Sequence, residues 1–456
     1  MKLLFTILLF PSFVFANTYY VSQNGSDDST GLSINSAWQT LSKVQSNVVS
    51  GDSVLFSRGS KFYGTLFLNS KNNIYFGSYG TGRQPLFWGT GSNAYPLINV
   101  SNCYNITFYN ILISDTTISP TDRTIIANIK VAIQIENNSN NVLIRKCTMD
   151  RVGYGVYITG SSSGQWVDSC DMGNLRMVVN TPGGDDDFGA IPVQFSSSSN
   201  SVSNNYFHDC YAFSYDYGYD GGAVEFFAED GASVQDNIVI YNTIYDCNGC
   251  FEFGANNVTT ISRNTIAYNK IINSSSFLYI NNSGIYEVYV QNAYLYNNIF
   301  IQTVASRTGE TDIIKLRIYD PTDSIIQCKN NIFWVTNGAN IFNADRFNDG
   351  QLIHENNMYK TNGNLNITLN PSEYNNISSP WVDITNTNPL YWDYNIPITS
   401  LANNNGTFVD ITRDFNDNVV DNPPSIGILE YAPIPPTPPV IFNKFVTEKK
   451  FVNSLP

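Results

Sequence analysis

A short pattern of alternating apolar and outward-facing residues recurs along the middle of the chain at intervals of 23 to 37 residues. In each copy, the residue predicted to face outward stands between apolar ones, which is the period of two expected of a strand with one buried face. Repetition at this interval predicts a solenoid, with each copy stacked on the next about 4.8 Å away. The copies are Ala132–Ile135, Gly155–Ile158, Pro192–Phe195, Ala223–Phe226, Cys250–Phe253 and Phe277–Ile280.

A second, asparagine-containing pattern recurs about half a coil after the first. We expect its asparagines to stack in a ladder, because side-chain amides in register can bond to one another and to the backbone of the bend. Cys147 and Cys170 occupy the equivalent place upstream and are 23 residues apart, which predicts stacked, buried thiols. The predicted ladder consists of Asn205, Asn242, Asn269, Asn298, Asn331 and Asn357.

Helical periodicity is almost absent from the sequence. Its best candidate is Ser36–Val44, where Ala37, Leu41 and Val44 are spaced for a short amphipathic helix. Such a helix would cover the open edge of the first coil, which otherwise invites association. The sequence therefore predicts an all-β parallel β-helix with a short N-terminal cap helix.

Composition limits the function further. A chain of 456 residues that is 42% hydrophobic can bury a large core. A formal charge of -14 argues against nucleic acid as a partner, since a polyphosphate needs a basic face. Seven cysteines are few and odd in number, which argues against a framework of disulfides.

The two ends of the chain differ from its repetitive middle. Residues 1–16 resemble a signal peptide, with Lys2, an apolar run over Leu3–Phe10 and a small-residue cleavage site at Val14–Ala16. We therefore expect an exported protein, extracellular or periplasmic. No later apolar run is long enough to span a membrane. Residues 17–432 are predicted to form one β-helix domain, and residues 433–456 a Pro-rich linker and tail.

Segments near both ends of the predicted domain carry a family resemblance. Tyr19–Asp27, Ala37–Leu41 and Gly51–Phe56 stand at its start, and Asp414–Asn416 with Pro424–Tyr431 at its end. They resemble segments of secreted right-handed parallel β-helix proteins of the pectate-lyase-like superfamily. The resemblance implies that fold and an active site on the strand face described next. It does not specify the reaction, because the superfamily includes polysaccharide lyases, glycoside hydrolases, epimerases and phage tailspikes.

The outward residues of the first pattern should form one stripe on the β-helix. Polar and aromatic side chains along a flat sheet suit an extended sugar chain, which needs both hydrogen-bond partners and stacking surfaces. Two long insertions, Gly183–Gly189 and Ser214–Gly222, run into this stripe. The residues predicted to bind substrate are Gln134, Tyr157, Gln194 and Tyr279 on the stripe and Tyr217 in the second insertion.

The insertions and the stripe together predict a cluster of carboxylates. Glu225 and Glu252 are 27 residues apart, one coil, so their Cβ atoms should be about 5 Å apart. Like charges at that separation raise one pKa and leave one proton donor and one carboxylate, as glycoside hydrolysis requires. Glu225 is the predicted donor, with Asp220 as its first-choice partner and Glu252 as the alternative. Asp187 and Asp216 would orient water or substrate.

Two other functions fit the same residues. Asp186, Asp187 and Asp216 offer the hard oxygen ligands that Ca²⁺ prefers. With calcium bound, the reaction would be β-elimination of a uronate polymer, with Arg151, Arg176 or Arg263 as candidates near the groove. The hydrolase needs no cofactor.

The third function is a non-catalytic glycan-binding protein or adhesin, in which the acids only keep the surface soluble. Clustering of the acids on adjacent coils argues against it, because mutual repulsion needs a functional reason or a cation. Both histidines are predicted to be turn residues, and His208 is a weak outside candidate for catalysis. The protein is expected to be a monomer with a polysaccharide as its partner.

Overall fold

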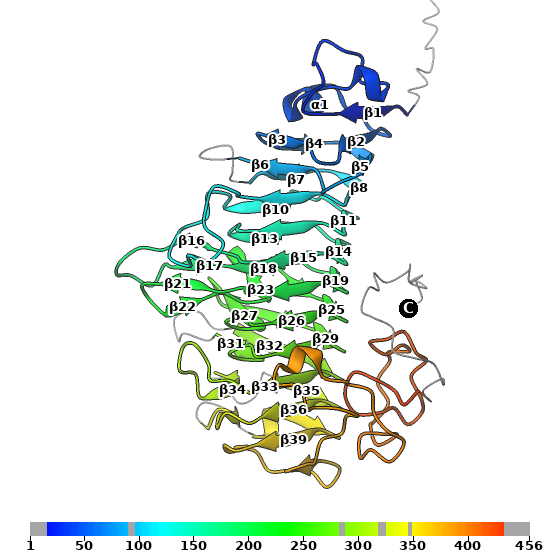
Figure 1. The fold of residues 1–456 in the computed structure, drawn as a ribbon. Coiled ribbons are helices and arrows are strands. Elements are labelled where there is room, and N and C mark those ends of the chain that lie inside the picture. Colours follow the sequence, from blue (N-terminus) through cyan, green and yellow to red (C-terminus); the bar gives the residue numbers. More distant parts are fainter. Residues whose placement is uncertain (1–15, 90–95, 282–287, 318–324, 345–348, 433–456) are drawn as a thin grey trace, which may run out of the picture.

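A computed structural model describes residues 16–89, 96–281, 288–317, 325–344 and 349–432 (Figure 1). The predicted tail, and all of the predicted signal peptide except residue 16, lie outside these residues. No helix in the described ranges is long and apolar enough to cross a membrane.

The chain winds into a right-handed parallel β-helix, as the sequence predicts. Successive coils stack along the long axis from the blue N-terminal end to the yellow end in Figure 1. Successive coils contribute strands to three long parallel sheets, here called sheets A, B and C, and two of the coils contribute two short strands each to sheet A.

Sheet A is the longest of the three in the described chain. Its strands are β1 (Thr18–Val21), β2 (Ser53–Ser57), β5 (Asn72–Tyr79), β8 (Tyr104–Tyr109), β11 (Leu143–Arg145), β14 (Trp166–Asp168), β19 (Ser201–Ser203), β24 (Val234–Gln235), β25 (Ile238–Ile240), β28 (Thr259–Ser262), β29 (Thr265–Ala267), β32 (Val288–Tyr296), β35 (Ile325–Lys329) and β38 (Leu352–Glu355).

Sheet B follows sheet A in each coil. Its strands are β3 (Lys61–Tyr63), β6 (Leu86–Trp88), β9 (Leu112–Ser114), β12 (Thr148–Asp150), β15 (Asp171–Gly173), β20 (Tyr206–His208), β26 (Thr243–Tyr245), β30 (Lys270–Ile272), β33 (Ile299–Gln302), β36 (Ile332–Val335), β39 (Met358–Thr361) and β40 (Tyr374–Asn375).

Sheet C contains the copies of the first sequence pattern. Its strands are β4 (Leu66–Asn69), β7 (Ile98–Ser101), β10 (Val131–Glu136), β13 (Tyr154–Ile158), β18 (Ile191–Phe195), β23 (Val224–Ala228), β27 (Phe251–Ala255), β31 (Leu278–Ile280), β34 (Asp312–Leu316) and β37 (Asn340–Phe342).

Two antiparallel hairpins leave the coils beside sheet C, on the left in Figure 1. The first pairs β16 (Met177–Val179) with β17 (Phe188–Gly189), and the second pairs β21 (Ala212–Ser214) with β22 (Gly218–Asp220). They are the two insertions predicted from the lengthened coils.

The asparagine ladder is confirmed. Each asparagine from Asn205 to Asn331 donates its Nδ2 hydrogen to the Oδ1 of the next, at 2.9–3.0 Å. Cys147 and Cys170, which stand upstream of the ladder, are buried and free. The other cysteines are also buried and free. A second, shorter ladder that we did not predict joins Asn200, Asn237 and Asn264.

The N-terminal cap helix is also present, but it begins later than predicted. Helix α1 (Leu41–Asn47) starts after Thr40, whose side chain accepts a hydrogen bond from the Lys43 N–H at 3.1 Å. Residues 37–40 are not helical, because Trp38 instead pairs with β1 at Val21, and only Ile34–Ser36 before them form a short 3₁₀ helix. Leu41 and Val44 are buried, and the helix contacts β4 of the first coils.

Candidate active site

Sheet C places one outward residue of each coil in a single row. The register pairs the six predicted stripe residues in order, from Gln134 to Tyr279. The row also extends beyond them, to Asn99 and Phe67 at one end and to Lys315 at the other. The predicted stripe is therefore confirmed as a physical row.

Glu225 and Glu252 are direct neighbours in this row. Both side chains are half-buried. Burial raises the pKa of Glu225 well above its usual range, and the charges of Glu252, Asp220 and Glu229 raise it further. Among the described residues, none donates a hydrogen bond that would stabilise the ionised form of Glu225. This carboxyl group is therefore suited to holding a proton.

Glu252 differs from Glu225 in its neighbours. Burial raises its pKa, but Asn281 donates a hydrogen bond to its Oε1 at 3.0 Å, and the positive charges of Lys315 and Arg317 act in the same direction as that bond. These three groups favour the ionised carboxylate. Of the two neighbouring acids, Glu252 is the one that the site equips to carry the negative charge.

Asp220 reaches the same place from the second hairpin. It ends β22, five residues before Glu225, and accepts a hydrogen bond from the N–H of Gly221 at 2.7 Å. Burial, with smaller contributions from Glu252 and Asp187, raises its pKa to about 7. The predicted grouping of Asp220 with Glu225 and Glu252 is consistent with these mutual effects.

Two further residues of the site were missed by sequence reasoning. Tyr154 is buried, and burial, followed by the charges of Glu225 and Asp220, raises its pKa. Its ring stacks on Tyr157 with centroids 5.8 Å apart. The Tyr157 hydroxyl donates to Glu229, the second missed residue. The one sequence signal that could have indicated Glu229 is that it stands four residues after Glu225, an even spacing that puts both side chains on the same face of an extended chain.

The predicted substrate-binding residues differ in accessibility. Gln194 is only 4% exposed, and the bond from Tyr157 to Glu229 passes over its coil. Tyr279 lies next to Glu252, with the Lys315 Nζ 4.9 Å and the Arg317 Cζ 5.0 Å from its ring centroid.

Two of these predicted residues lie farther from the carboxylate pair. Gln134 lies three coils from Glu225 and donates to Glu136 at 2.8 Å. Tyr217 is exposed in the turn of the second hairpin, where its hydroxyl donates to Asp185.

The remaining predicted acids join the two hairpins. Asp187 is buried and accepts hydrogen bonds from Thr181 N, Ser214 Oγ and Asp216 N at 2.7–3.1 Å. Burial opposes its charge, but these bonds outweigh it and lower the pKa of Asp187. Asp216 in turn accepts from the backbone N–H groups of Asp186 and Asp187.

These acids also form the predicted candidate metal site. Oxygens of Asp186, Asp187 and Asp216 lie within 4.8 Å of one another. The donor set is all-oxygen, as Ca²⁺ requires. Two of the three carboxylates already accept backbone hydrogen bonds, so they connect the hairpins with or without a cation.

The basic residues proposed for elimination are held in other contacts. Arg151 forms an ion pair with Asp150 at 2.7 Å, and Arg263 one with Asp236 at 2.7 Å. Arg176 is fully buried and donates to the backbone carbonyls of Asn174, Leu175 and Ser119. The cations beside the carboxylates are instead Lys315 and Arg317, which we did not predict.

Neither histidine belongs to the row on sheet C. His208 lies on sheet B between Asp171 and Asp209, at 3.1 and 2.8 Å. Although burial opposes its charge, these two acids raise the pKa of His208 to about 10. A histidine that stays protonated at neutral pH is poorly suited to act as a general base.

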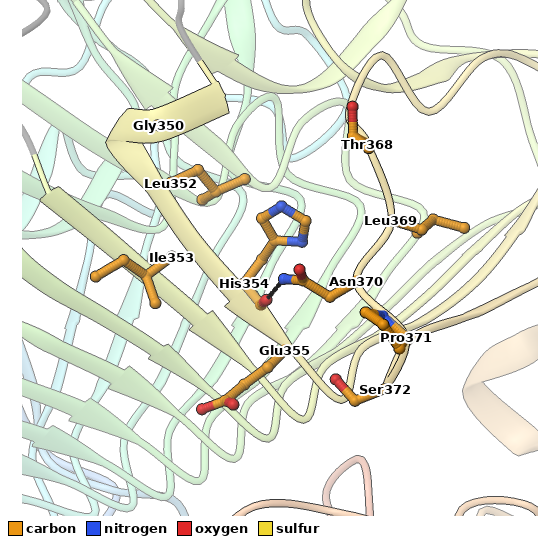
Figure 2. Close-up of a pocket in the computed structure, with 10 residues that line it drawn as sticks. All are labelled: Gly350, Leu352, Ile353, His354, Glu355, Thr368, Leu369, Asn370, Pro371 and Ser372. Carbon is orange, nitrogen blue, oxygen red and sulfur yellow. Dashed lines mark hydrogen bonds between the residues drawn. The ribbon is translucent and has the colours of Figure 1, made fainter.

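A separate hollow of about 740 Å³ lies at the C-terminal end of the β-helix and is lined by β38 and residues 368–372 (Figure 2). His354 borders it, and its Nδ1 lies 2.7 Å from the buried Glu373. Glu373 also accepts from Asn357 Nδ2 and Tyr359 Oη. Glu373 is thereby the last acceptor of the asparagine ladder. None of the predicted catalytic residues lines this hollow.

Comparison with known proteins yields likenesses of fold. No protein-family model matches the sequence, and no curated protein matches it. Solved structures that match include a GH136 lacto-N-biosidase from Eubacterium ramulus, with 13% identity and a TM-score of 0.46 over 78% of this chain. This chain spans 66% of that protein's length.

Two other matched structures cover different shares of the chain. A pectate lyase, Pel9A, has 15% identity and a TM-score of 0.47 over 92% of this chain and 98% of its own. A mutant tailspike protein of E. coli bacteriophage HK620, in complex with a pentasaccharide, has 12% identity and a TM-score of 0.44 over 75% and 63%. All three are likenesses of fold alone.

Proposed function

We propose that the protein cleaves a polysaccharide by hydrolysis of its glycosidic bonds. Glu225 donates the proton to the leaving oxygen, and Glu252 is the ionised carboxylate. The observation that carries the proposal is the pairing of these residues on adjacent coils, with hydrogen-bond and cationic support for Glu252 only. This arrangement supplies the protonated and ionised carboxyl groups that glycoside hydrolysis needs.

The chemistry divides between the two residues. Protonation by Glu225 makes the sugar oxygen a better leaving group as the bond breaks. Glu252 either attacks the anomeric carbon or activates a water molecule, depending on its separation from the donor. Burial, followed by the charges of Glu252, Asp220 and Glu229, raises the pKa of Glu225 and so favours its protonated form. This assignment takes Glu252 in preference to Asp220 as the partner.

The shape of the row supports a polymer as substrate. It runs from Phe67 to Lys315 over nine coils, which at about 4.8 Å per coil is about 40 Å. The two hairpins stand beside its middle, where the carboxylates lie. A sugar chain lying along the row would contact the coils of Tyr279 and Lys315 on one side of the pair, whereas on the other side the bond from Tyr157 to Glu229 lies over the coil of Gln194.

The decisive test of catalysis is Glu225→Gln. We expect the variant to lose at least 100-fold in turnover, since a positioned general acid contributes about 10²–10⁴-fold. Its Tm should not be lower than that of the parent, because glutamine is almost isosteric with glutamate and the variant no longer buries the carboxyl group of Glu225. Glu355→Gln, on sheet A, is the matched control and should remain fully active. A fully active Glu225→Gln protein would contradict the assignment.

The reaction type is tested on a panel of polysaccharides. New reducing ends without ultraviolet absorbance would support hydrolysis. Absorbance of unsaturated uronates that disappears with a calcium chelator would instead support a lyase, with Asp186, Asp187 and Asp216 as metal ligands. Two observations favour that second candidate: the clustering of these carboxylates and the presence of Lys315 beside the site.

Binding of a glycan without product would support the third function, a non-catalytic binding protein. Export and a monomeric state remain predictions. Gel filtration of the purified protein and analysis of its N-terminus after export would test them.

A further inference from the structure

Phe227 presents an aromatic ring on the same face as the carboxylate pair. Its neighbours Phe226 and Ala228 are fully buried, so the alternation of the strand directs Phe227 outward. It stands two residues after Glu225 and is half-buried. In the register it pairs with Gly254, which stands two residues after Glu252. The row of Glu225 and Glu252 therefore has a second row beside it, formed by Phe227 and Gly254.

A side chain at Gly254 would collide with the ring of Phe227. A Cβ atom at Gly254 would lie 2.8 Å from Cδ2 and 3.1 Å from Cε2 of Phe227. Both distances are shorter than an ordinary contact. The same Cβ would lie 3.9 Å from Oε1 of Glu252. The ring therefore lies against the backbone of Gly254, close to the catalytic carboxylate.

We propose that Phe227 is the platform on which the sugar ring at the cleavage point stacks. This inference rests on the proposed function and deepens it. The ring is half-buried, and its exposed part is the surface that a ligand can reach. An apolar ring among carboxylates has no ion or hydrogen bond to offer, so its suitable partner is the C–H face of a pyranose.

The platform would position the substrate relative to the acids. The ring belongs to the same strand as Glu225 and is adjacent to Glu252 on the next coil. A sugar stacked on it would have its reacting bond beside the two carboxyl groups. Asn281 follows Ile280, the partner of Phe253 on the next coil, and donates a hydrogen bond to Glu252.

The first experiment measures binding without turnover. Phe227→Ala, Phe227→Tyr and the matched control Phe408→Ala are each made in the Glu225→Gln protein. Phe408 is 60% exposed in the C-terminal segment. Affinity electrophoresis uses gels that contain polygalacturonate, rhamnogalacturonan, arabinogalactan or xyloglucan. We expect about tenfold weaker binding for Phe227→Ala, and parent-like binding for Phe227→Tyr and Phe408→Ala.

The second experiment tests the role of Gly254 by a double-mutant cycle. Gly254→Ala should weaken binding by displacing the ring. Once Phe227 is alanine, adding Gly254→Ala should have no further effect, because the ring that it displaces is gone. If Gly254→Ala weakens binding equally in both backgrounds, it acts through Glu252 instead, and the platform is contradicted. Thermal unfolding of each variant verifies that it is folded.

The outcomes separate this proposal from the proposed function. Turnover by the Glu225→Gln protein would overturn the catalytic assignment, while the comparison of Phe227→Ala with Phe408→Ala would still decide the platform. Unchanged binding of Phe227→Ala would overturn the platform alone. Failure of the parent to bind any of the four polysaccharides would also count against the platform. In the active protein, Phe227→Ala should raise KM more than it lowers kcat.

Discussion

At Asp220, the folded protein disfavours the ionised form of the carboxyl group. Its pKa is about 7 in the folded protein because of burial and then the charges of Glu252 and Asp187, against 3.8 for the ordinary group. A carboxyl group with a raised pKa binds its proton more tightly in the folded state than in the unfolded one. Its contribution to stability is therefore present at low pH and is lost as the pH rises from about 4 to about 7.

The variant Asp220→Asn tests this pH dependence of stability. The variant should have a higher Tm than the parent at pH 8, where it removes a charge that the fold disfavours. Near pH 3, where Asp220 is largely protonated in both states, the two proteins should unfold at similar temperatures. Calorimetry at both pH values is the measurement, with the exposed Asp28→Asn as control. A lower Tm at pH 8 would show that ionised Asp220 stabilises the fold.

Sequence reasoning predicted part of the arrangement of the candidate site, for a simple reason. Period-two alternation identifies outward residues without knowledge of the fold, so Glu225 and Glu252 were found. Lys315 fits the same pattern within Ile313–Leu316, and extending the search by one coil would have found it. Phe227 lies one residue beyond the pattern. The location of Tyr154 depends on packing beneath the first hairpin, which no local pattern indicates.

At the scale of elements, the asparagine ladder connects the coils that carry the site. Asn269 donates to Val239 O and Asn298 Oδ1, both at 3.0 Å, and its Oδ1 accepts from the backbone and side chain of Asn242. It is fully buried. Each of these bonds satisfies a polar group that water cannot reach, so the ladder makes stacking of consecutive coils interdependent.

Asn269→Ala tests this interdependence. Truncation leaves several buried donors and acceptors unpaired, each at a cost of about 1–3 kcal/mol, so we expect a loss of about 3 kcal/mol or more in the free energy of unfolding. Denaturation by guanidinium chloride measures it, and Asn35→Ala at an exposed position is the control. A loss below about 1 kcal/mol would mean that water or relaxation replaces the ladder.

The second ladder shows what element-scale reasoning could have added. Asn200, Asn237 and Asn264 each stand five residues before a member of the first ladder. That fixed offset is visible in the sequence, because both ladders follow from the same coil geometry. The delayed start of α1 is different: it depends on the pairing of Trp38 with Val21, a contact between distant parts of the chain.

At the scale of the whole molecule, the C-terminal segment covers a surface away from the site. Residues 376–431, orange to red in Figure 1, lie beside the stacked coils. Their apolar side chains form a second hydrophobic cluster with outward residues of sheet B and the preceding turns, among them Ile301, Trp334 and Met358. This segment has no repeat, so its docking surface could not be predicted from periodicity. The candidate active site and this packing use different faces of the β-helix.

Trp381→Ala tests the separation of the two faces. Trp381 is 5% exposed, and its ring lies 5.5 Å from Trp334 and 5.3 Å from Tyr394 between centroids. Removing it should cost about 3–5 kcal/mol of stability and expose residues 376–431 to limited proteolysis. Coils contact mainly their neighbours, so kcat and KM on the identified polysaccharide should remain those of the parent under conditions where the variant is folded. A fall in kcat without unfolding would show that the segment helps to position the carboxylates through the sheets.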